Sequence, residues 1–171
     1  MLRAMNARFR LIAAHDPEWI PTVRALFEEY GASLGFHLCF QSFDDELRTL
    51  PGKYAPPAGR IYLALTEAAD AAASGVAVGC VALRPLEDGA CELKRMYVRP
   101  DWRRAGVARA LAERLIVDAR AIGYRVMRLD TLHTMTAANR LYEALGFRDA
   151  PAYCYNPFPE ARYMEFALAE A

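Results

Sequence analysis

The feature that most constrains the fold is a change of hydrophobic period near the middle of the chain. From Arg60 to Pro100 the apolar residues alternate with a period of two in three runs, IYLALT, VAVGCVALRP and CELKRMYVRP. This period predicts β-strands, and the dipeptide Asp88-Gly89 between the last two runs is a hairpin signal, so we expect an antiparallel meander. The next segment carries one apolar stripe at helical spacing and ends at Gly123. The stripe consists of Ala108, Leu111, Ala112, Leu115, Ile116, Ala119 and Ile122.

A further strand is predicted at Val126 to Thr131, directly after this helix. A strand, a helix and a strand in that order imply a right-handed parallel crossover. The sheet should therefore be mixed, antiparallel first and then parallel at Met96 and Leu129.

The rest of the chain adds shorter elements at both ends. At the N-terminal end we expect a strand at Phe9 to Ala14, a helix capped by Asp16 that runs to Tyr30, and a shorter helix that opens at Ser42 or Asp44 and ends at Leu50. At the C-terminal end we expect a helix from Thr136 to Ala144, a strand from Phe147 onward and a last strand at Arg162 to Leu168. Gly31 to Phe40 is predicted to be a loop.

Composition predicts one globular domain over residues 1–171. The chain is 54% hydrophobic, and its 21 basic residues balance 21 acidic ones, so no global field draws it to nucleic acid or to a membrane. The four cysteines lack a metal-ligand spacing or a dense disulfide framework, and we predict no metal. With no signal peptide and no long apolar run, the expected location is cytoplasmic.

Positive charge concentrates at the turn between the third meander strand and the long helix. The segment from Glu92 to Arg109, both included, holds six basic residues and two acidic ones, and Gly106 lies at the helix start. The first amides of a helix are unpaired and carry positive potential, so a strand-to-helix turn of this kind can bind an anion. Solvated arginines at an ordinary helix start are the alternative.

Two segments resemble the GNAT N-acetyltransferase superfamily, in particular a small bacterial member. The run Arg103, Arg104, Ala105, Gly106, Val107 and Ala108 fits its [QR]-x-x-G-x-[GA] signature. The run from Ala138 to Phe147 is similar to its A-x-x-L-Y-x-x-x-G-F segment, and the resemblance spans roughly Arg60 to Leu168. It implies the GNAT fold, of α/β class and α+β type: a mixed, mostly antiparallel sheet of six to seven strands, a parallel splayed central pair and about four helices.

The resemblance also implies acetyl-CoA as co-substrate and acetyl transfer to an amine. The diphosphate would lie on the amides of Arg104 to Ala108, and the pantetheine arm would pair with backbone near Met96, Tyr97 and Val98. Asn139 and Tyr142 are further candidate cofactor contacts. Family members often carry an asparagine seven residues before this tyrosine, whereas this chain has Met135 there.

Transfer to an amine needs a proton acceptor and a proton donor. At pH 7 a neutral amine with the pKa of lysine costs about 4.6 kcal/mol to form. Glu92, eleven residues before Arg103, resembles the general base of histone-type members, acting through a water; the alternative is a strand glutamate beside Lys94. Tyr142 stands where the family has its general acid; the alternative is a core tyrosine.

The acceptor is predicted to be a small-molecule or peptide amine. Aromatic residues are frequent in the segments that line the acceptor pocket of this fold, although such residues are more often core. The candidate acceptor contacts are Tyr30, Phe36, Phe40, Tyr153, Tyr155 and Asn156. Exposed strand edges would also allow a homodimer. The rival function is a catalytically silent CoA-binding sensor or interaction module.

Overall fold

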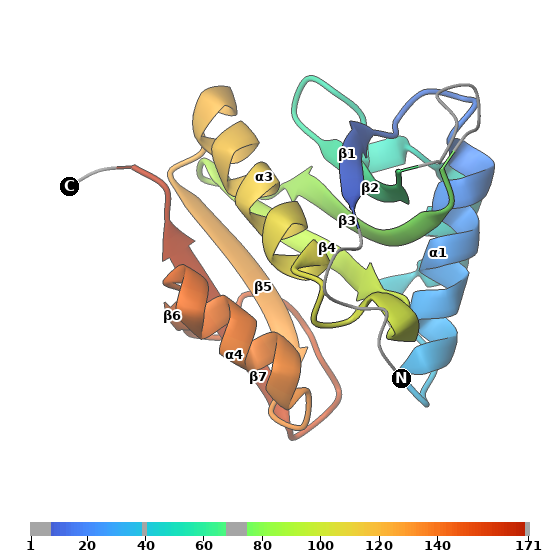
Figure 1. Cartoon of the computed structure of the whole chain (residues 1–171). Helices are drawn as coiled ribbons and strands as arrows, with labels where there is room; N and C mark the ends of the chain where they lie inside the picture. Colours follow the sequence, from blue (N-terminus) through green and yellow to red (C-terminus); the bar gives the residue numbers. More distant parts are fainter. Residues whose placement is uncertain (1–7, 39–40, 68–74, 170–171) are drawn as a thin grey trace.

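A seven-stranded sheet with helices on both faces organises the molecule (Figure 1). The computed structural model describes residues 8–38, 41–67 and 75–169. The strands lie in the order β1-β2-β3-β4-β5-β7-β6. They are β1 (Phe9–Ala13), β2 (Arg60–Thr66), β3 (Ala77–Pro85), β4 (Ala90–Val98), β5 (Val126–Leu132), β6 (Arg148–Asp149) and β7 (Ala161–Ala167). The helices are α1 (Ile20–Ser33), α2 (Phe43–Thr49), α3 (Val107–Ile122) and α4 (Thr136–Leu145), with short 3-10 turns at Gly52–Tyr54 and Pro100–Trp102.

The predicted mixed sheet is confirmed, with one correction at its centre. Strands β1 to β4 form an antiparallel meander, and β4 and β5 are parallel neighbours. They pair only where Ala90 to Glu92 faces Val126 to Arg128, so Met96 and Leu129 do not pair as the sequence predicted. Beyond Glu92 the two strands diverge toward their carboxyl ends (Figure 1). The backbone edges that face each other across this splay have no strand partner there among the described residues.

A bulge in β4 changes which face its side chains meet. Cys80 of β3 pairs with Tyr97, but Ala82 pairs with Lys94, so β4 has one residue more than β3 between these two pairs. Arg95 has a left-handed φ of 59° at this point. An extra residue shifts the alternation of a strand by one. Lys94 and Arg95, although adjacent, therefore both contact Gln41 on the α1 and α2 side.

Two apolar cores lie on opposite faces of the sheet. One contains Leu111 and Leu115 of α3 together with Tyr142 of α4, and the other contains Leu26 and Phe27 of α1. Close packing positions the start of α3. A Cβ on Gly79 of β3 would lie 2.9 Å from the carbonyl oxygen of Tyr97 and 3.1 Å from Val107 Cγ1. Because only glycine fits there, the first residue of α3 lies directly against β3.

Helix α1 differs from its predicted bounds at both ends. Asp16 does not cap it: Asp16 and Trp19 form a preceding turn, and the N-cap is Trp19, with proline in the first helical turn. The helix also continues through Gly31, where a Cβ would lie 3.0 Å from the ring of Phe43. The Phe43 ring, at the start of α2, therefore packs directly on the backbone of α1 at Gly31. Among the described residues, no helix is long and apolar enough to cross a membrane.

Candidate functional site

The turn before α3 has the geometry of an anion site. Gly106 is the N-cap of α3 and has φ of 81°, and Arg104 has φ of 71°. Of the five amides from Arg104 to Ala108, only that of Ala105 donates a hydrogen bond to another described residue, the carbonyl of Trp102 at 3.3 Å. A Cβ on Gly106 would meet nothing within 4 Å, so the turn is open outward. Four free amides at a helix start fit a diphosphate.

Only part of the predicted positive charge lies at this turn. Arg103 and Arg104 are exposed beside it, and Arg109 pairs with Glu113 at 3.3 Å. Arg99 instead binds both carboxylate oxygens of Glu29 and the carbonyl of Ala77. Lys94 and Arg95 are buried on the other side of the sheet. The anion site therefore rests mainly on main-chain amides, with exposed arginines around them.

A cavity of about 60 Å³ lies in the splay between β4 and β5. Its lining comes from both faces of the sheet. On the α3 and α4 side it is lined by Leu93, Met96, Leu129, Met135, Ala138 and Tyr142. On the α1 and α2 side it is lined by Tyr30, Leu34, Phe36, Leu38, Gln41, Lys94, Arg95, Asp130 and Asn156. A cavity that passes through the sheet can bring together two substrates that approach from opposite faces.

Tyr142 lies at the α4 end of this cavity. Its side chain is 5% exposed and packs against Phe147, with ring centroids 5.7 Å apart. Its hydroxyl forms no hydrogen bond with another described residue. Burial raises the pKa of Tyr142 well above its usual range. The hydroxyl is therefore protonated at neutral pH and faces the cavity as a potential proton donor.

Met135 and Asn139 lie near the start of α4 and have different surroundings. Met135 occupies the place of the missing asparagine and lines the cavity; its sulfur accepts a hydrogen bond from Thr131 at 3.7 Å. Asn139 donates from Nδ2 to the carbonyls of Leu132, at 3.0 Å, and His133, at 3.3 Å. Its buried Oδ1 has no partner among the described residues. Asn139 thus fixes α4 to the end of β5 and keeps one acceptor unused.

Glu92 is buried behind the cavity and does not line it. Its Oε2 accepts a hydrogen bond from Arg84 Nε at 2.6 Å, and its Oε1 accepts one from the Tyr153 hydroxyl at 2.8 Å. Lys94 Nζ lies 3.6 Å from the same Oε1. The carboxylate of this candidate base is therefore surrounded by protein groups.

Asp130 is the carboxylate that reaches the cavity. It is the acidic residue among the described lining residues, and its Oδ2 accepts a hydrogen bond from Asn156 Nδ2 at 3.0 Å. Its Oδ1 lies 3.5 Å from Lys94 Nζ. Lys94 in turn donates to Gln41 Oε1 at 3.1 Å. A cation and an anion thus face the cavity side by side.

These two residues belong to a larger group of buried charges, which we term the charge cluster. Arg95 makes two hydrogen bonds to Glu46, at 2.7 and 2.8 Å, and one to Gln41 at 2.9 Å. Its guanidinium also lies over the ring of Phe43, 4.9 Å from the centroid. The charge cluster consists of Arg84, Lys94, Arg95, Glu46, Glu92 and Asp130. It therefore holds three positive and three negative groups.

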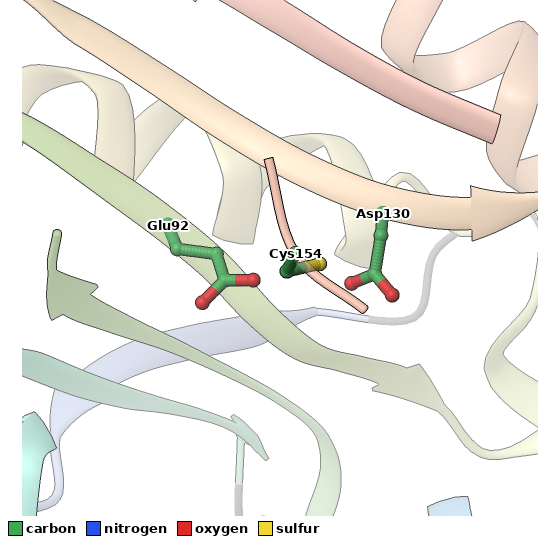
Figure 2. Close-up of side chains that lie close together, drawn as sticks. All are labelled: Glu92, Asp130 and Cys154. Carbon is green, nitrogen blue, oxygen red and sulfur yellow. The ribbon is translucent and has the colours of Figure 1, made fainter. Parts of the chain in front are cut away.

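Figure 2 shows Glu92 of β4, Asp130 of β5 and Cys154 of the β6–β7 loop pointing toward one another. One potential ligand atom from each of them lies within 4.8 Å of the others. Lys94 Nζ, however, lies 3.5 to 3.6 Å from both carboxylates and places a positive charge beside them. Burial, followed by the charges of Asp130 and Glu92, raises the pKa of Cys154 to about 11. An ammonium beside the carboxylates and a protonated thiol suit a polar network better than a divalent cation.

The structure brings some of the predicted acceptor contacts to the cavity. Tyr30, Phe36 and Asn156 line it. Tyr153 does not, but it holds Glu92 through its hydroxyl, and Tyr155 is 75% exposed. Phe40 lies outside the described residues. Of the strand residues, Met96 lines the cavity, Val98 packs with the α3 core and Tyr97 with the α1 core.

Sequence reasoning missed Asp130, Lys94 and Gln41. One signal was available for Asp130. Because side chains alternate along β5, Asp130 lies on the face of the strand that carries Arg128 and not on the face that buries Leu129. No such signal existed for Lys94 and Gln41, which lie 53 residues apart and meet through tertiary packing.

The chain is similar in sequence to known acetyltransferases. Residues 22–147 match the model of the acetyltransferase (GNAT) family. An uncharacterized N-acetyltransferase of Schizosaccharomyces pombe is 37% identical over 155 residues, which cover 90% of this chain and 91% of that protein. Human N-acetylaspartate synthetase is 38% identical over 116 residues, 67% of this chain and 35% of that protein.

A solved structure has the same fold. The acyl-CoA N-acyltransferase described from Klebsiella pneumoniae superposes with a TM-score of 0.64 at 29% identity, over 98% of this chain and all of that one. Enzymes of the matched family use acetyl-CoA as the acetyl donor. With a family match over most of its length and a relative that aligns nearly end to end, this chain belongs to the GNAT family of acetyltransferases.

Proposed function

We propose that this acetyltransferase transfers the acetyl group of acetyl-CoA directly to the amine of a small molecule. The observation that carries the proposal is the cavity through the splay, with Tyr142 on one face of the sheet and Asp130 on the other. The open turn at Gly106 lies at the foot of α3, on the same face as Tyr142. The donor would enter from the face of α3 and α4, and the acceptor from the face of α1 and α2.

A small acceptor is supported by how the α1 and α2 face of the cavity is partly covered. The ring of Phe36, from the segment after α1, lies 4.3 Å from that of Phe158 in the β6–β7 loop. These two segments meet over the cavity, and Asn156 of the same loop lines it. A small, partly covered space suits a small amine better than a protein tail. The name of the synthetase relative, which specifies an acetylated amino acid, supports the same size class.

The residues at the cavity supply the two proton transfers that the reaction needs. We assign direct contact with the acceptor amine to Asp130, because Asp130 faces the cavity. Glu92 instead supplies the negative charge that holds Lys94 and Arg84 in place. The amine nitrogen forms the new bond to the acetyl carbon as the carbon–sulfur bond breaks. Tyr142 donates its proton to the leaving sulfur. Of the two protons that an ammonium loses overall, one reaches solvent through Asp130 and the other restores Tyr142.

Direct transfer is also supported by two of the described thiols, those of Cys91 and Cys154. Cys91 faces the α3 core, on the opposite side of β4 from Glu92, and burial raises its pKa to about 12. Cys154 does not line the cavity, and its pKa is raised as well. A protonated thiol away from the cavity is a poor nucleophile for an acetyl-enzyme intermediate.

The test is Tyr142→Phe, measured by thiol release from acetyl-CoA over a panel of small amines. We expect the wild type to release thiol with at least one amine, and the variant to lose 10²-fold or more of kcat, which is the contribution typical of a general acid. Acetyl-CoA affinity, measured by calorimetry, should stay within about threefold because the donor's diphosphate binds elsewhere.

The matched control is Tyr124→Phe. This tyrosine donates to the carbonyl of Ala58 and does not line the cavity, so its loss should leave kcat unchanged. Wild-type kcat in Tyr142→Phe would remove the general acid from the proposal. Acetyl-CoA binding without thiol release for any amine would favour a CoA-binding sensor.

A further inference from the structure

The two charges that face the cavity have unused hydrogen-bonding capacity. Lys94 has three N–H donors, and its one hydrogen bond among the described residues goes to Gln41. Its distances of 3.6 Å to Glu92 Oε1 and 3.5 Å to Asp130 Oδ1 exceed those of good hydrogen bonds. Asp130 accepts a hydrogen bond at Oδ2 and none at Oδ1 from a described residue. Both side chains are nearly buried, at 6% and 7% exposed, so this unused capacity calls for a polar ligand.

Arg95 also lines the cavity but offers little to a ligand. Its guanidinium makes three hydrogen bonds, two to Glu46 and one to Gln41, and its side chain is 1% exposed. The cation available to an acceptor is therefore Lys94, and the available anion is Asp130. They lie side by side on β4 and β5, where the strands have separated.

Charge balance restricts what can bind beside them. The charge cluster holds three cations and three anions, all partly or fully buried. A simple alkylammonium would add one uncompensated positive charge to it, and a simple carboxylate would add one negative charge. Uncompensated charge is costly at a buried site. A zwitterion adds none.

We propose that the acceptor is an amino acid, or another small amine with a carboxylate close to the nitrogen. Its ammonium would donate to Asp130 Oδ1, and its carboxylate would accept from the free N–H groups of Lys94. The 3.5 Å between these two protein atoms requires a ligand whose opposite charges are similarly close, as on the head of an amino acid. The inference rests on the proposed acetyl transfer and adds the identity of the acceptor class.

The size of the cavity indicates that the enzyme distinguishes acceptors by their amine and carboxylate groups and not by their side chains. A volume of about 60 Å³ corresponds to about four to six water molecules. That space matches the amino-acid head, with its nitrogen, α-carbon and carboxylate, while the acceptor's side chain extends beyond it. Selection between a carboxylate and its uncharged amide is therefore expected to be stronger than selection among side chains.

The experiment compares matched acceptors in the thiol-release assay. Each amino acid is paired with its carboxamide and with the amine that lacks the carboxylate. We expect kcat/KM to be at least tenfold higher for the free acid in at least one set. Equal use of acid and amide in every set that reacts would overturn the proposal.

Two variants separate the two halves of the site. Lys94→Gln should bring the acid-to-amide ratio to within about threefold, whereas Asp130→Asn should lower kcat/KM for acid and amide alike and leave the ratio unchanged. The matched control is Lys53→Gln, at the only other lysine of the sequence, which is exposed and does not line this cavity. A ratio that survives Lys94→Gln in a folded variant would overturn the role of Lys94. If Lys94→Gln does not fold, the proposal is tested by the acid-to-amide ratio of kcat/KM in the wild type alone.

Calorimetry distinguishes failure of this inference from failure of the proposed reaction. If no amine releases thiol, the same acids and amides are titrated into protein saturated with CoA. An acid that binds at least tenfold more tightly than its amide would support the zwitterion site without any turnover. Equal affinity, or no binding of either, would overturn it.

Discussion

The two sides of the splay are built in opposite ways. The donor side depends on the turn from Arg103 to Ala108, six consecutive residues of which four, Arg104, Gly106, Val107 and Ala108, have main-chain amides without a partner among the described residues. The acceptor side depends on the charge cluster, whose side chains come from α2, β3, β4 and β5 and are held by one another. The first needs a backbone shape and tolerates many side chains, whereas the second needs particular side chains in a particular fold. Binding of the donor and choice of the acceptor should therefore respond differently to mutation.

The largest effect is expected at the turn. Gly106→Glu should weaken acetyl-CoA binding at least 100-fold, because the new side chain would place bulk and negative charge where the diphosphate is expected. A Cβ there meets no protein atom within 4 Å, so the domain should still fold, with a strain of about 1 kcal/mol from the left-handed φ. Calorimetric titration with acetyl-CoA measures the effect.

Gly123→Ala is the matched control for backbone strain. This glycine ends the same helix, has φ of 101° and has equally open surroundings. The control should lose similar stability and keep its affinity for acetyl-CoA within about twofold. Unchanged affinity in Gly106→Glu would exclude the turn as the diphosphate site.

The contrast between the two sides also explains what the sequence could predict. The strand and helix periods, the parallel crossover and the turn at Gly106 depend on neighbouring residues, and all were predictable. The separation of β4 from β5 agrees with the splayed pair that the family resemblance implies. No local pattern announces where the pairing stops, hence the error at Met96 and Leu129, or the bulge in β4 that follows.

The same bulge determines the acceptor side. Strict alternation would place Lys94 and Arg95 on opposite faces of β4, but the extra residue directs both toward Gln41. Glu92 was found from its spacing to Arg103, whereas its burial behind Arg84 and Tyr153 needed the tertiary structure. The sequence thus identified a candidate base, but it could not predict whether that base reaches the acceptor.

A second test asks whether Glu92 supports the structure or acts on the acceptor. Glu92→Gln should lower the free energy of unfolding by about 3 kcal/mol, because it leaves Arg84 and Lys94 short of a buried counter-charge. Urea unfolding measures this change. The control is Glu165→Gln, which removes a half-exposed pair with Arg128 and should cost less than about 1 kcal/mol.

The rate of Glu92→Gln separates the two roles further. If Glu92 were the general base, the variant would keep its stability and lose rate, most strongly at low pH where neutral amine is scarce. A loss of stability with a nearly unchanged pH profile of kcat would assign Glu92 to the support of the charge cluster. Asp130 would then be the remaining carboxylate at the cavity.

The smallest effect is expected at the ion pair that joins the two sides. Arg99, just before the donor turn, binds both carboxylate oxygens of Glu29 on α1. The hydrogen bond from Arg99 holds the pKa of Glu29 below its usual value. A lowered pKa in the folded state adds stability above the unfolded pKa of about 4.3, and this stability is lost as the pH falls further. Both side chains are about one-third exposed, so the pair should contribute at most about 1 kcal/mol.

Glu29→Gln should therefore lower Tm by a few degrees near pH 7, and the difference from wild type should shrink as the pH falls below about 4. Thermal unfolding of both proteins between pH 3 and pH 7 measures it, with the neighbouring exposed Glu28→Gln as a control that leaves Tm unchanged. Acetyl-CoA affinity gives a second readout. If the pair only joins α1 to the sheet, affinity will follow stability. If it also holds the donor turn in place, affinity will fall near neutral pH while the protein is still fully folded, and the two sides of the splay would then be coupled through α1.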